Sequence, residues 1–170
     1  MIRGMIFDLD GVLVDTARFH YLAWKRLARE WFGLDFTPAD NERFKGVNRE
    51  ACMRILCEMA GRTLSEEDFA RGMALKNDWY VQRVREMTPE DVLPGAADYV
   101  RAARAQGVRC AIGSASKNCR LVLERTGIAG LFDAVADGTV VTRAKPDPEV
   151  FLCCLLYTSP RPRDRSLSRM

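Results

Sequence analysis

The first apolar run of the chain is separated from any partner strand by a long helical block. Residues 2–8 are rich in Ile, Met and Phe, which favours a strand that ends at Asp8. Residues 16–91 instead have helical spacing throughout, beginning with apolar side chains four positions apart from Phe19 to Trp31. Helix and strand patterns alternate only after a Pro-Gly turn at 94–95. This order predicts a parallel α/β core with a helical insertion after its first strand.

The spacing of apolar residues and turn signals gives approximate bounds for each element. We expect strands at 2–8, 108–112 and 134–136, and helices at 16–32, 49–60, 65–75, 76–87, 96–106 and 116–126. The predicted fold class is therefore an α/β core with a parallel sheet and an inserted helical cap. The core comprises residues 1–15 and 92–153, and the cap comprises residues 16–91.

Composition excludes several classes of protein. The chain has 170 residues, 48% hydrophobic and 29% charged, which is typical of a soluble globular domain. No apolar run approaches the ~20 residues that a membrane helix needs. The N-terminus has no secretory pattern, and the six cysteines form no C-x-x-C pair. We therefore expect a reduced, cytoplasmic protein that does not bind membranes.

The net charge of +3 lies entirely in the last residues of the chain. Residues 154–170 contain four arginines and one aspartate, so the remaining residues sum to zero. A charge confined to this segment gives no basic surface for nucleic acid, and we expect no nucleic-acid partner.

Two carboxylates follow the first predicted strand. Asp8 and Asp10 lie two positions apart, so both point to one side if the backbone remains extended through Leu9. Ligands of open α/β sheets bind at this carboxyl edge, and Gly11 would let the loop approach one closely. The alternative is a polar turn with no chemical role.

Two further features suit a phosphate ligand. Ser114 ends the second core strand, and residues 115–118 could offer backbone N–H groups to an anion before the next helix. Lys145 supplies a cation beside Pro146. Locally, however, a helix N-cap and a solvated lysine explain these residues equally well.

Taken together and in this order, these motifs resemble those of the haloacid dehalogenase superfamily, most of whose members transfer phosphoryl groups. The resemblance implies a Rossmann-like core, incomplete here. It implies that Asp8 is the nucleophile and Asp10 the general acid and base. It also implies that Ser114 and Lys145 bind the transferring phosphate. Mg²⁺ would be held at Asp8 and Asp10 with a later carboxylate, but no acidic motif of that kind follows Lys145.

A narrower resemblance, to the β-phosphoglucomutase family, covers roughly residues 1–152. The matching stretches are 7–16, 45–49, 75–77, 94–95, 114–118 and 145–146. It implies interconversion of β-glucose 1-phosphate and glucose 6-phosphate through an aspartyl-phosphate enzyme and β-glucose 1,6-bisphosphate, by a monomer. The implied catalytic residue of the cap is His20, and the implied substrate-binding residues are Thr16, Lys45, Gly46, Arg49, Lys76, Ala115, Ser116, Lys117 and Asn118.

Two rival functions remain open. A sugar-phosphate phosphatase would use Asp8 in the same way but pass the phosphoryl group to water. An inactive fragment would account for the missing acidic motif.

Residues 154–170 do not continue the resemblance. Residues 154–159 read as a translation of TGT CTC TTA TAC ACA TCT, which is similar to a transposon-end adapter used in sequencing libraries. The prolines, arginines and serines that follow have no apolar period, which is typical of a disordered tail. We expect this tail to be non-native, the natural protein to be longer, and the 170-residue chain to fold poorly and be nearly inactive.

Overall fold

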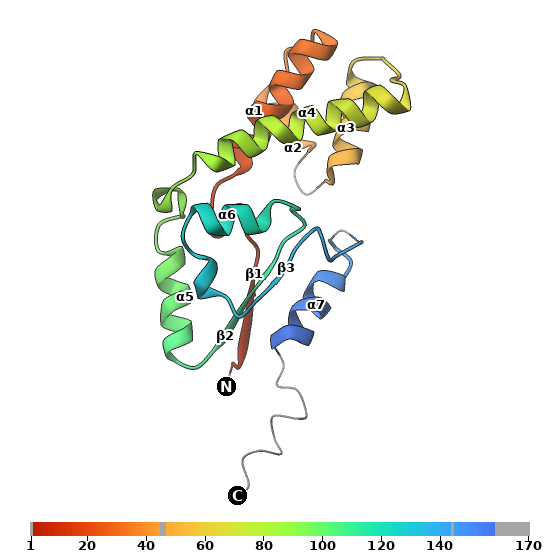
Figure 1. The fold of residues 1–170 in the computed structure, drawn as a ribbon. Coiled ribbons are helices and arrows are strands. Elements are labelled where there is room, and N and C mark those ends of the chain that lie inside the picture. The colour runs from red at the N-terminus through yellow and green to blue at the C-terminus, as the bar shows by residue number, and fades with distance from the viewer. Residues whose placement is uncertain (1, 45–46, 144, 159–170) are drawn as a thin grey trace, which may run out of the picture.

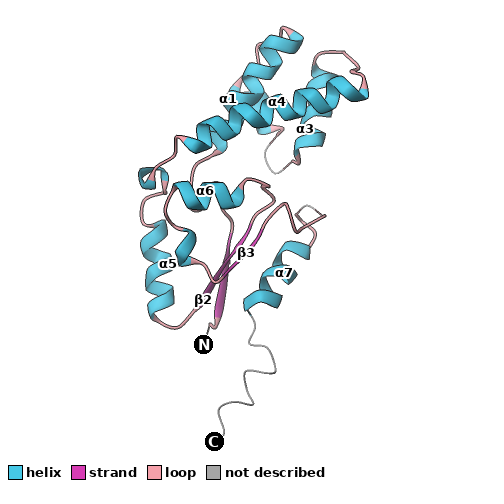
Figure 2. Cartoon of the chain, in the orientation of Figure 1, coloured by secondary structure: helices cyan, strands magenta, loops and turns pink. Residues whose placement is uncertain are grey.

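The computed structural model describes residues 2–44, 47–143 and 145–158 of the 170-residue chain. A small parallel sheet flanked by helices forms one end of the molecule, and a group of helices forms the other (Figures 1 and 2). The predicted strands occur in the predicted order, with the helical group inserted between the first and second strands, although the short helix Pro38–Glu42 in that group was not predicted.

The described helices are α1 (Ala17–Leu27), α2 (Pro38–Glu42), α3 (Arg49–Met59), α4 (Glu66–Arg85), α5 (Ala96–Ala105), α6 (Cys119–Arg125) and α7 (Glu149–Thr158). A π-helical turn, Ala28–Phe32, continues α1, and short 3₁₀ turns lie at Pro89–Asp91 and Ala129–Leu131. None of the helices in the described part of the chain is long and apolar enough to cross a membrane.

The sheet contains three parallel strands in the order β1 (Gly4–Phe7), β2 (Arg109–Gly113) and β3 (Ala134–Ala136). The register pairs Phe7 with Ile112, so the carboxyl ends of β1 and β2 are level with each other. These ends face the inserted helices (Figure 1). All three strands were predicted, and the parallel α/β fold class is confirmed.

Successive side chains of β2 are buried on opposite faces of the sheet, as the two-residue period of a strand requires. Cys110 and Ile112 belong to the cluster that contains the buried side chains of α5 and α6. Ala111 belongs to a separate cluster with Val150 and Cys154 of α7. The sheet is therefore the middle layer of three, which is why β2 reads as a continuous apolar run.

The inserted helices have an apolar cluster of their own. Its fully buried side chains are Leu27, Ala28, Phe36, Met53 and Leu56. The sequence predicted two helices over 65–87, but α4 is one continuous helix. Gly72 lies inside it, where a Cβ would come within 2.7 Å of the Met53 Cε, so the close packing of Met53 favours a glycine at this position.

The chain enters and leaves the helical group through two adjacent linkers. Val14 and Val92 form an antiparallel bridge, and the Leu93 N–H donates to the Leu13 carbonyl oxygen at 2.8 Å. Movement of the helices relative to the sheet would therefore bend both linkers together.

The helix α7 extends beyond the predicted end of the native sequence. Val150 and Cys154 lie one helical turn apart and both are buried, and the Cys154 thiol donates to the Ile112 carbonyl oxygen at 3.1 Å. The prediction of a disordered chain from residue 154 is thus wrong for 154–158, because this i, i+4 pair gives the segment an apolar face. Residues 159–170 lie outside the described residues, and the non-native origin of the tail stays a prediction.

The central position of Ile112 gives a test of this core. Replacing fully buried Ile112 with Ala should lower the free energy of unfolding by about 2–5 kcal/mol, because the transfer free energy is lost and a cavity is left. Urea denaturation followed by circular dichroism measures this. The matched change Val140→Ala, at a residue that is 47% exposed, should cost less than about 0.5 kcal/mol. Equal costs for the two variants would contradict the described packing.

Candidate active site

A tight turn follows β1 and holds the first aspartate. Leu9 is fully buried, and its N–H donates to the Asp8 Oδ1 at 2.8 Å. Gly11 has a positive φ of 78°, a conformation that L residues rarely adopt, and its N–H donates to the Val14 carbonyl oxygen. These two hydrogen bonds fix the conformation of the turn, while the Asp8 side chain remains 42% exposed.

The Asp8 carboxylate has a cationic partner. The Lys145 Nζ lies 2.8 Å from the Asp8 Oδ2. The loop before α7 is held in turn by Glu149, which accepts hydrogen bonds from the N–H groups of Thr142 and Arg143. The structure thus brings together two predicted site residues that are far apart in the sequence.

Asp10 lies in a more buried environment than Asp8. Its Oδ1 accepts a hydrogen bond from Thr16, a fully buried residue at the start of α1. Burial, and to a lesser degree the charge of Asp8, raises the pKa of Asp10 above its ordinary value, although Thr16 and Lys145 oppose this rise. A carboxyl group in this state is suited to exchanging a proton nearer neutral pH.

The loop between β2 and α6 is organised by its own hydroxyl groups. The buried Ser114 Oγ accepts from the Ser116 N–H at 3.1 Å, and the Ser116 Oγ accepts from the Asn118 N–H at 3.2 Å. These bonds compete with helical ones, so α6 begins at Cys119 rather than at the predicted 116. Ala115 and Lys117 are exposed.

The end of β3 supports this loop and was not predicted as part of the site. The Gly138 N–H donates to the Ser116 carbonyl oxygen at 3.2 Å, and a Cβ at Gly138 would collide with the Ala115 carbonyl oxygen. Asp137 is fully buried and pairs with Arg120 at 3.1 Å. An acidic residue directly after the predicted strand 134–136 was the available signal.

A second group of predicted residues lies within the inserted helices. Lys76 is 2% exposed, and its Nζ lies 2.8 Å from the His20 Nδ1. Burial, with Arg49 nearby, lowers the pKa of Lys76 to about 7. Burial, followed by the charges of Lys76 and Arg49, lowers the pKa of His20 to about 3. The imidazole of His20 is therefore neutral at physiological pH and can accept a hydrogen bond from Lys76.

Arg49 is linked to the core by Asn77, a residue with no predicted role. The Asn77 Oδ1 of α4 accepts a hydrogen bond from the Arg49 guanidinium at 2.7 Å. The same oxygen accepts from the Asn118 amide at 3.1 Å. Asn77 follows Lys76 directly in one of the matching stretches, which was the signal that could have identified it.

Tyr80 connects the two groups and was also missed. Its ring stacks on His20 with a centroid distance of 4.0 Å, and its hydroxyl is buried without a hydrogen-bond partner among the described residues. Burial, with nearby Asp10, raises the pKa of Tyr80, while the neighbouring hydroxyls of Thr16 and Ser116 lower it. A tyrosine one helical turn after Lys76 reads as ordinary core in a sequence, so the pattern alone gave no signal.

Two predicted residues cannot be placed, because Lys45 and Gly46 lie outside the described residues. Within the described ranges, no group of three His, Cys, Asp or Glu side chains is arranged to hold a metal ion. The oxygen donors of Asp8 and Asp10 nonetheless suit Mg²⁺, which commonly binds one or two carboxylates together with water and substrate phosphate. The residues present therefore fit part of such a site.

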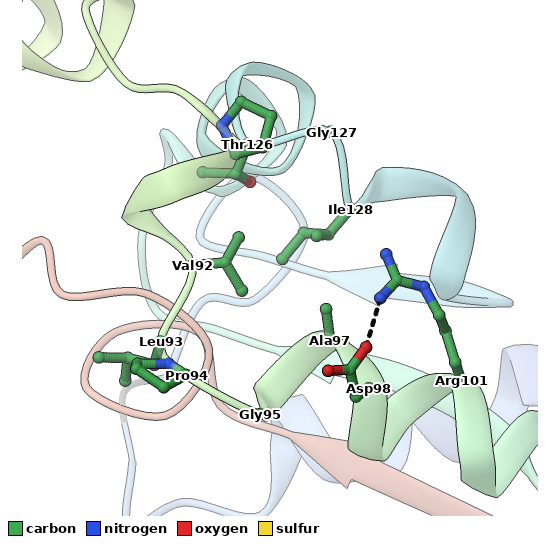
Figure 3. A pocket seen from close by; sticks show the side chains of 11 residues that line it. Val92, Leu93, Pro94, Gly95, Ala97, Asp98, Arg101, Thr126, Gly127 and Ile128 are labelled. Carbon is green, nitrogen blue, oxygen red and sulfur yellow. Dashed lines mark hydrogen bonds and ion pairs between the residues drawn. The ribbon is translucent and has the colours of Figure 1, made fainter.

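A cavity of about 320 Å³ lies elsewhere, between the return linker at 92–95 and the loop at 126–128 (Figure 3). Its polar side chains include Asp98 and Arg101, which pair with each other at 2.8 Å. Neither Asp8 nor Asp10 lines this cavity. The exposed Asp8 and its cation place the candidate site at the strand edge instead.

Comparisons with known proteins identify the family of the chain. The model of the haloacid dehalogenase-like hydrolase family matches residues 2–155. The chain is 33% identical over 165 residues to a β-phosphoglucomutase of Bacillus subtilis, covering 96% of this chain and 73% of that protein. The chain therefore belongs to the haloacid dehalogenase-like hydrolase family.

Similar proteins within the family have more than one activity. A crystal structure of a β-phosphoglucomutase from Clostridium difficile matches with a TM-score of 0.86 and 36% identity, covering 96% of this chain and 74% of that one. A phosphorylated carbohydrates phosphatase of Thermotoga maritima is 28% identical, covering 91% of this chain and 69% of that protein.

His20 is the only histidine of the chain, so its titration can be followed without assignment. We predict that its imidazole resonances do not titrate between pH 5 and pH 8, spanning about 1.5 units on either side of the ordinary value, because its folded-state pKa is about 3 rather than 6.5. In a Lys76→Met variant the pKa should rise, since a neighbouring positive charge is removed. ¹H–¹⁵N NMR over this range measures both, and a wild-type midpoint near 6.5 would contradict the described burial.

The same shift links pH to stability. Because the unfolded chain binds a proton on His20 that the folded chain excludes, the His20 contribution to the free energy of unfolding decreases as pH falls from 6.5 towards about 3.

Proposed function

We propose that this chain carries the phosphoryl-transfer site of a β-phosphoglucomutase, with Asp8 as the group that is phosphorylated. The observation that carries the proposal is the exposed Asp8 carboxylate, paired with Lys145 and adjacent to the more buried Asp10. Phosphorylation of an aspartate requires a nucleophilic carboxylate and a nearby group that carries a proton. The different environments of Asp8 and Asp10 suit these two roles.

In the proposed first step, an Asp8 carboxylate oxygen attacks the phosphorus of β-glucose 1,6-bisphosphate. The bond between phosphorus and a sugar oxygen breaks, and protonated Asp10 donates its proton to that oxygen. Lys145 and Ser114 hold the phosphate oxygens, so that the anion can approach the carboxylate. The products are the aspartyl-phosphate and a sugar monophosphate.

In the second step, the 6-hydroxyl of an incoming β-glucose 1-phosphate receives the phosphoryl group. Asp10, now a carboxylate, removes the hydroxyl proton, and the hydroxyl oxygen attacks the phosphorus of the aspartyl-phosphate. Asp8 is regenerated and β-glucose 1,6-bisphosphate forms. When this bisphosphate binds in the opposite orientation, its 1-phosphate undergoes the first step and glucose 6-phosphate is released. The raised pKa of Asp10 supports its use in both directions of proton transfer.

The remaining predicted residues would bind the substrate. We assign the non-transferring phosphate to Arg49 with Ser116, Lys117 and Asn118, because a guanidinium fork suits an oxyanion. Lys76 would contact the sugar phosphate, and His20 would couple cap closure to the position of Asp10. Thr16, which bonds Asp10 at the start of α1, fits such a coupling. Lys45, Gly46 and Ala115 complete the proposed set.

We also propose that residues 16–91 act as a cap over the core formed by 1–15 and 92–153. The paired linkers support this division, because Val14 and Val92 would bend together when the cap closes. Closure would exclude water, which favours transfer to sugar over hydrolysis.

Mg²⁺ is the cofactor that this chemistry would use. The Asp8 carboxylate and the Asp10 backbone carbonyl would hold it, and when bound it would neutralise charge on the transferring phosphate.

The second candidate function is a sugar-phosphate phosphatase. Its support is the Thermotoga maritima relative, whose name gives it phosphatase activity on phosphorylated carbohydrates. Asp8, Asp10 and Lys145 would act in the same way, with water as the acceptor. The two functions differ only in the acceptor of the phosphoryl group, which is a sugar hydroxyl in the mutase and water in the phosphatase.

Parallel assays of one reaction mixture separate the candidates. The chain is supplied with β-glucose 1-phosphate, a trace of β-glucose 1,6-bisphosphate and Mg²⁺, and both glucose 6-phosphate and free phosphate are measured. We expect glucose 6-phosphate to form faster than free phosphate, and Asp8→Asn to abolish both, since an amide cannot form the acyl-phosphate. Free phosphate as the main product would favour the phosphatase, and neither product would favour an inactive fragment.

A further inference from the structure

The Asn77 carboxamide joins two groups that come from opposite sides of the junction between the inserted helices and the core. Arg49 is the first residue of α3, and Asn118 immediately precedes α6. One oxygen atom, the Asn77 Oδ1, accepts from both, at 2.7 Å and 3.1 Å. All three side chains are partly buried, so the bonds are shielded from competition with bulk water.

The choice of a neutral acceptor has an electrostatic consequence. Among the residues that the structure describes, no carboxylate pairs with Arg49, whereas Arg26, Arg54 and Arg104 each pair with one at 2.9 Å or closer. An amide oxygen orients the guanidinium without neutralising it. Arg49 therefore keeps its full charge and its remaining N–H donors for an anion.

Asn118 is oriented from two sides. Its backbone N–H donates to the Ser116 Oγ, and its side-chain amide donates to the Asn77 Oδ1. With both contacts made, the amide has one N–H left, and this lies on the same loop as Ser116 and Lys117. The arrangement brings donors from α3 and from the 114–118 loop to one place before any ligand arrives.

We infer that Asn77 is a positioning residue that holds Arg49 and Asn118 together, so that their free donors converge on the non-transferring phosphate of the sugar phosphate. This inference rests on the proposed function, because it assigns that phosphate to Arg49 and Asn118. Holding the two donors in place in advance lowers the entropy lost on binding.

The test compares three variants by the dissociation constant for glucose 6-phosphate, measured by isothermal titration calorimetry in Mg²⁺ buffer. Asn77→Ala should weaken binding about 10-fold, because the hydrogen bonds to a charged donor and to Asn118 are lost. Asn77→Asp should weaken it further, about 100-fold, because the new carboxylate pairs with Arg49 and repels the phosphate. Gln82→Ala, which removes an exposed carboxamide from the same helix, should bind like the wild type.

The order of the two Asn77 variants distinguishes positioning for an anion from a purely structural role. Aspartate has nearly the same shape and can accept both hydrogen bonds, so a structural role predicts that Asn77→Asp behaves like the wild type. Affinity in Asn77→Asp equal to wild type, or no loss in Asn77→Ala, would overturn the inference and leave the proposed function standing. A wild-type chain that binds no sugar phosphate would overturn both. Thermal melting of each variant shows that the differences do not come from unfolding.

Discussion

The parallel register of β1 and β2 is the constraint on which the site depends. Because Phe7 lies opposite Ile112, the chain leaves both strands at the same level of the sheet edge. Asp8 directly follows β1 and Ser114 directly follows β2, so a nucleophile and a phosphate-binding hydroxyl lie at the same edge of the sheet. A slip of one residue would turn Ile112 out of the cluster that contains α5 and α6, so the packing of the core fixes the register and, through it, the chemistry.

The inserted helices contribute a different kind of environment, in which cations are buried rather than paired with carboxylates. Lys76 is almost fully buried beside the neutral His20, and burial together with the charge of Arg49 makes its protonated form less favourable. Such an arrangement costs stability in the empty protein, and an anionic ligand would relieve it. A phosphate placed there would therefore be bound partly by charges that the fold leaves unneutralised. This is how the insertion and the strand edge would act as one site.

Much of the architecture could be predicted from periodicity because the buried side chains of a helix or strand recur at a regular spacing along the chain. The strands at 4–7, 109–113 and 134–136 and the helix at 96–105 have apolar patterns bounded by Gly or Pro signals. The helix α7 continues past residue 153 because Cys154 packs under the sheet, a contact that a local pattern does not reveal. The predicted division between residues 75 and 76 was wrong because no Gly or Pro lies there to end a helix, and α4 is continuous.

The candidate site was predictable to the extent that its residues follow strands. Asp8, Asp10, Ser114 and Lys145 were singled out by their residue types and positions, and the resemblance added His20, Arg49 and Lys76. Asn77, Tyr80 and Asp137 were missed because their importance lies in what they contact across the fold. An amide, a tyrosine and an aspartate have common structural uses, so only the three-dimensional structure distinguishes these three from the others.

The central claim, that Asp8 carries the phosphoryl group, can be tested in a single turnover without a complete catalytic cycle. The chain is mixed with β-glucose 1,6-bisphosphate and Mg²⁺, quenched in acid, digested and analysed by mass spectrometry. We expect an acid-stable phosphoryl group on Asp8, in the peptide that includes Asp10, and none in an Asp8→Asn variant. A phosphoryl group on any other residue, or its persistence in Asp8→Asn, would contradict the role of Asp8 as the phosphorylated group.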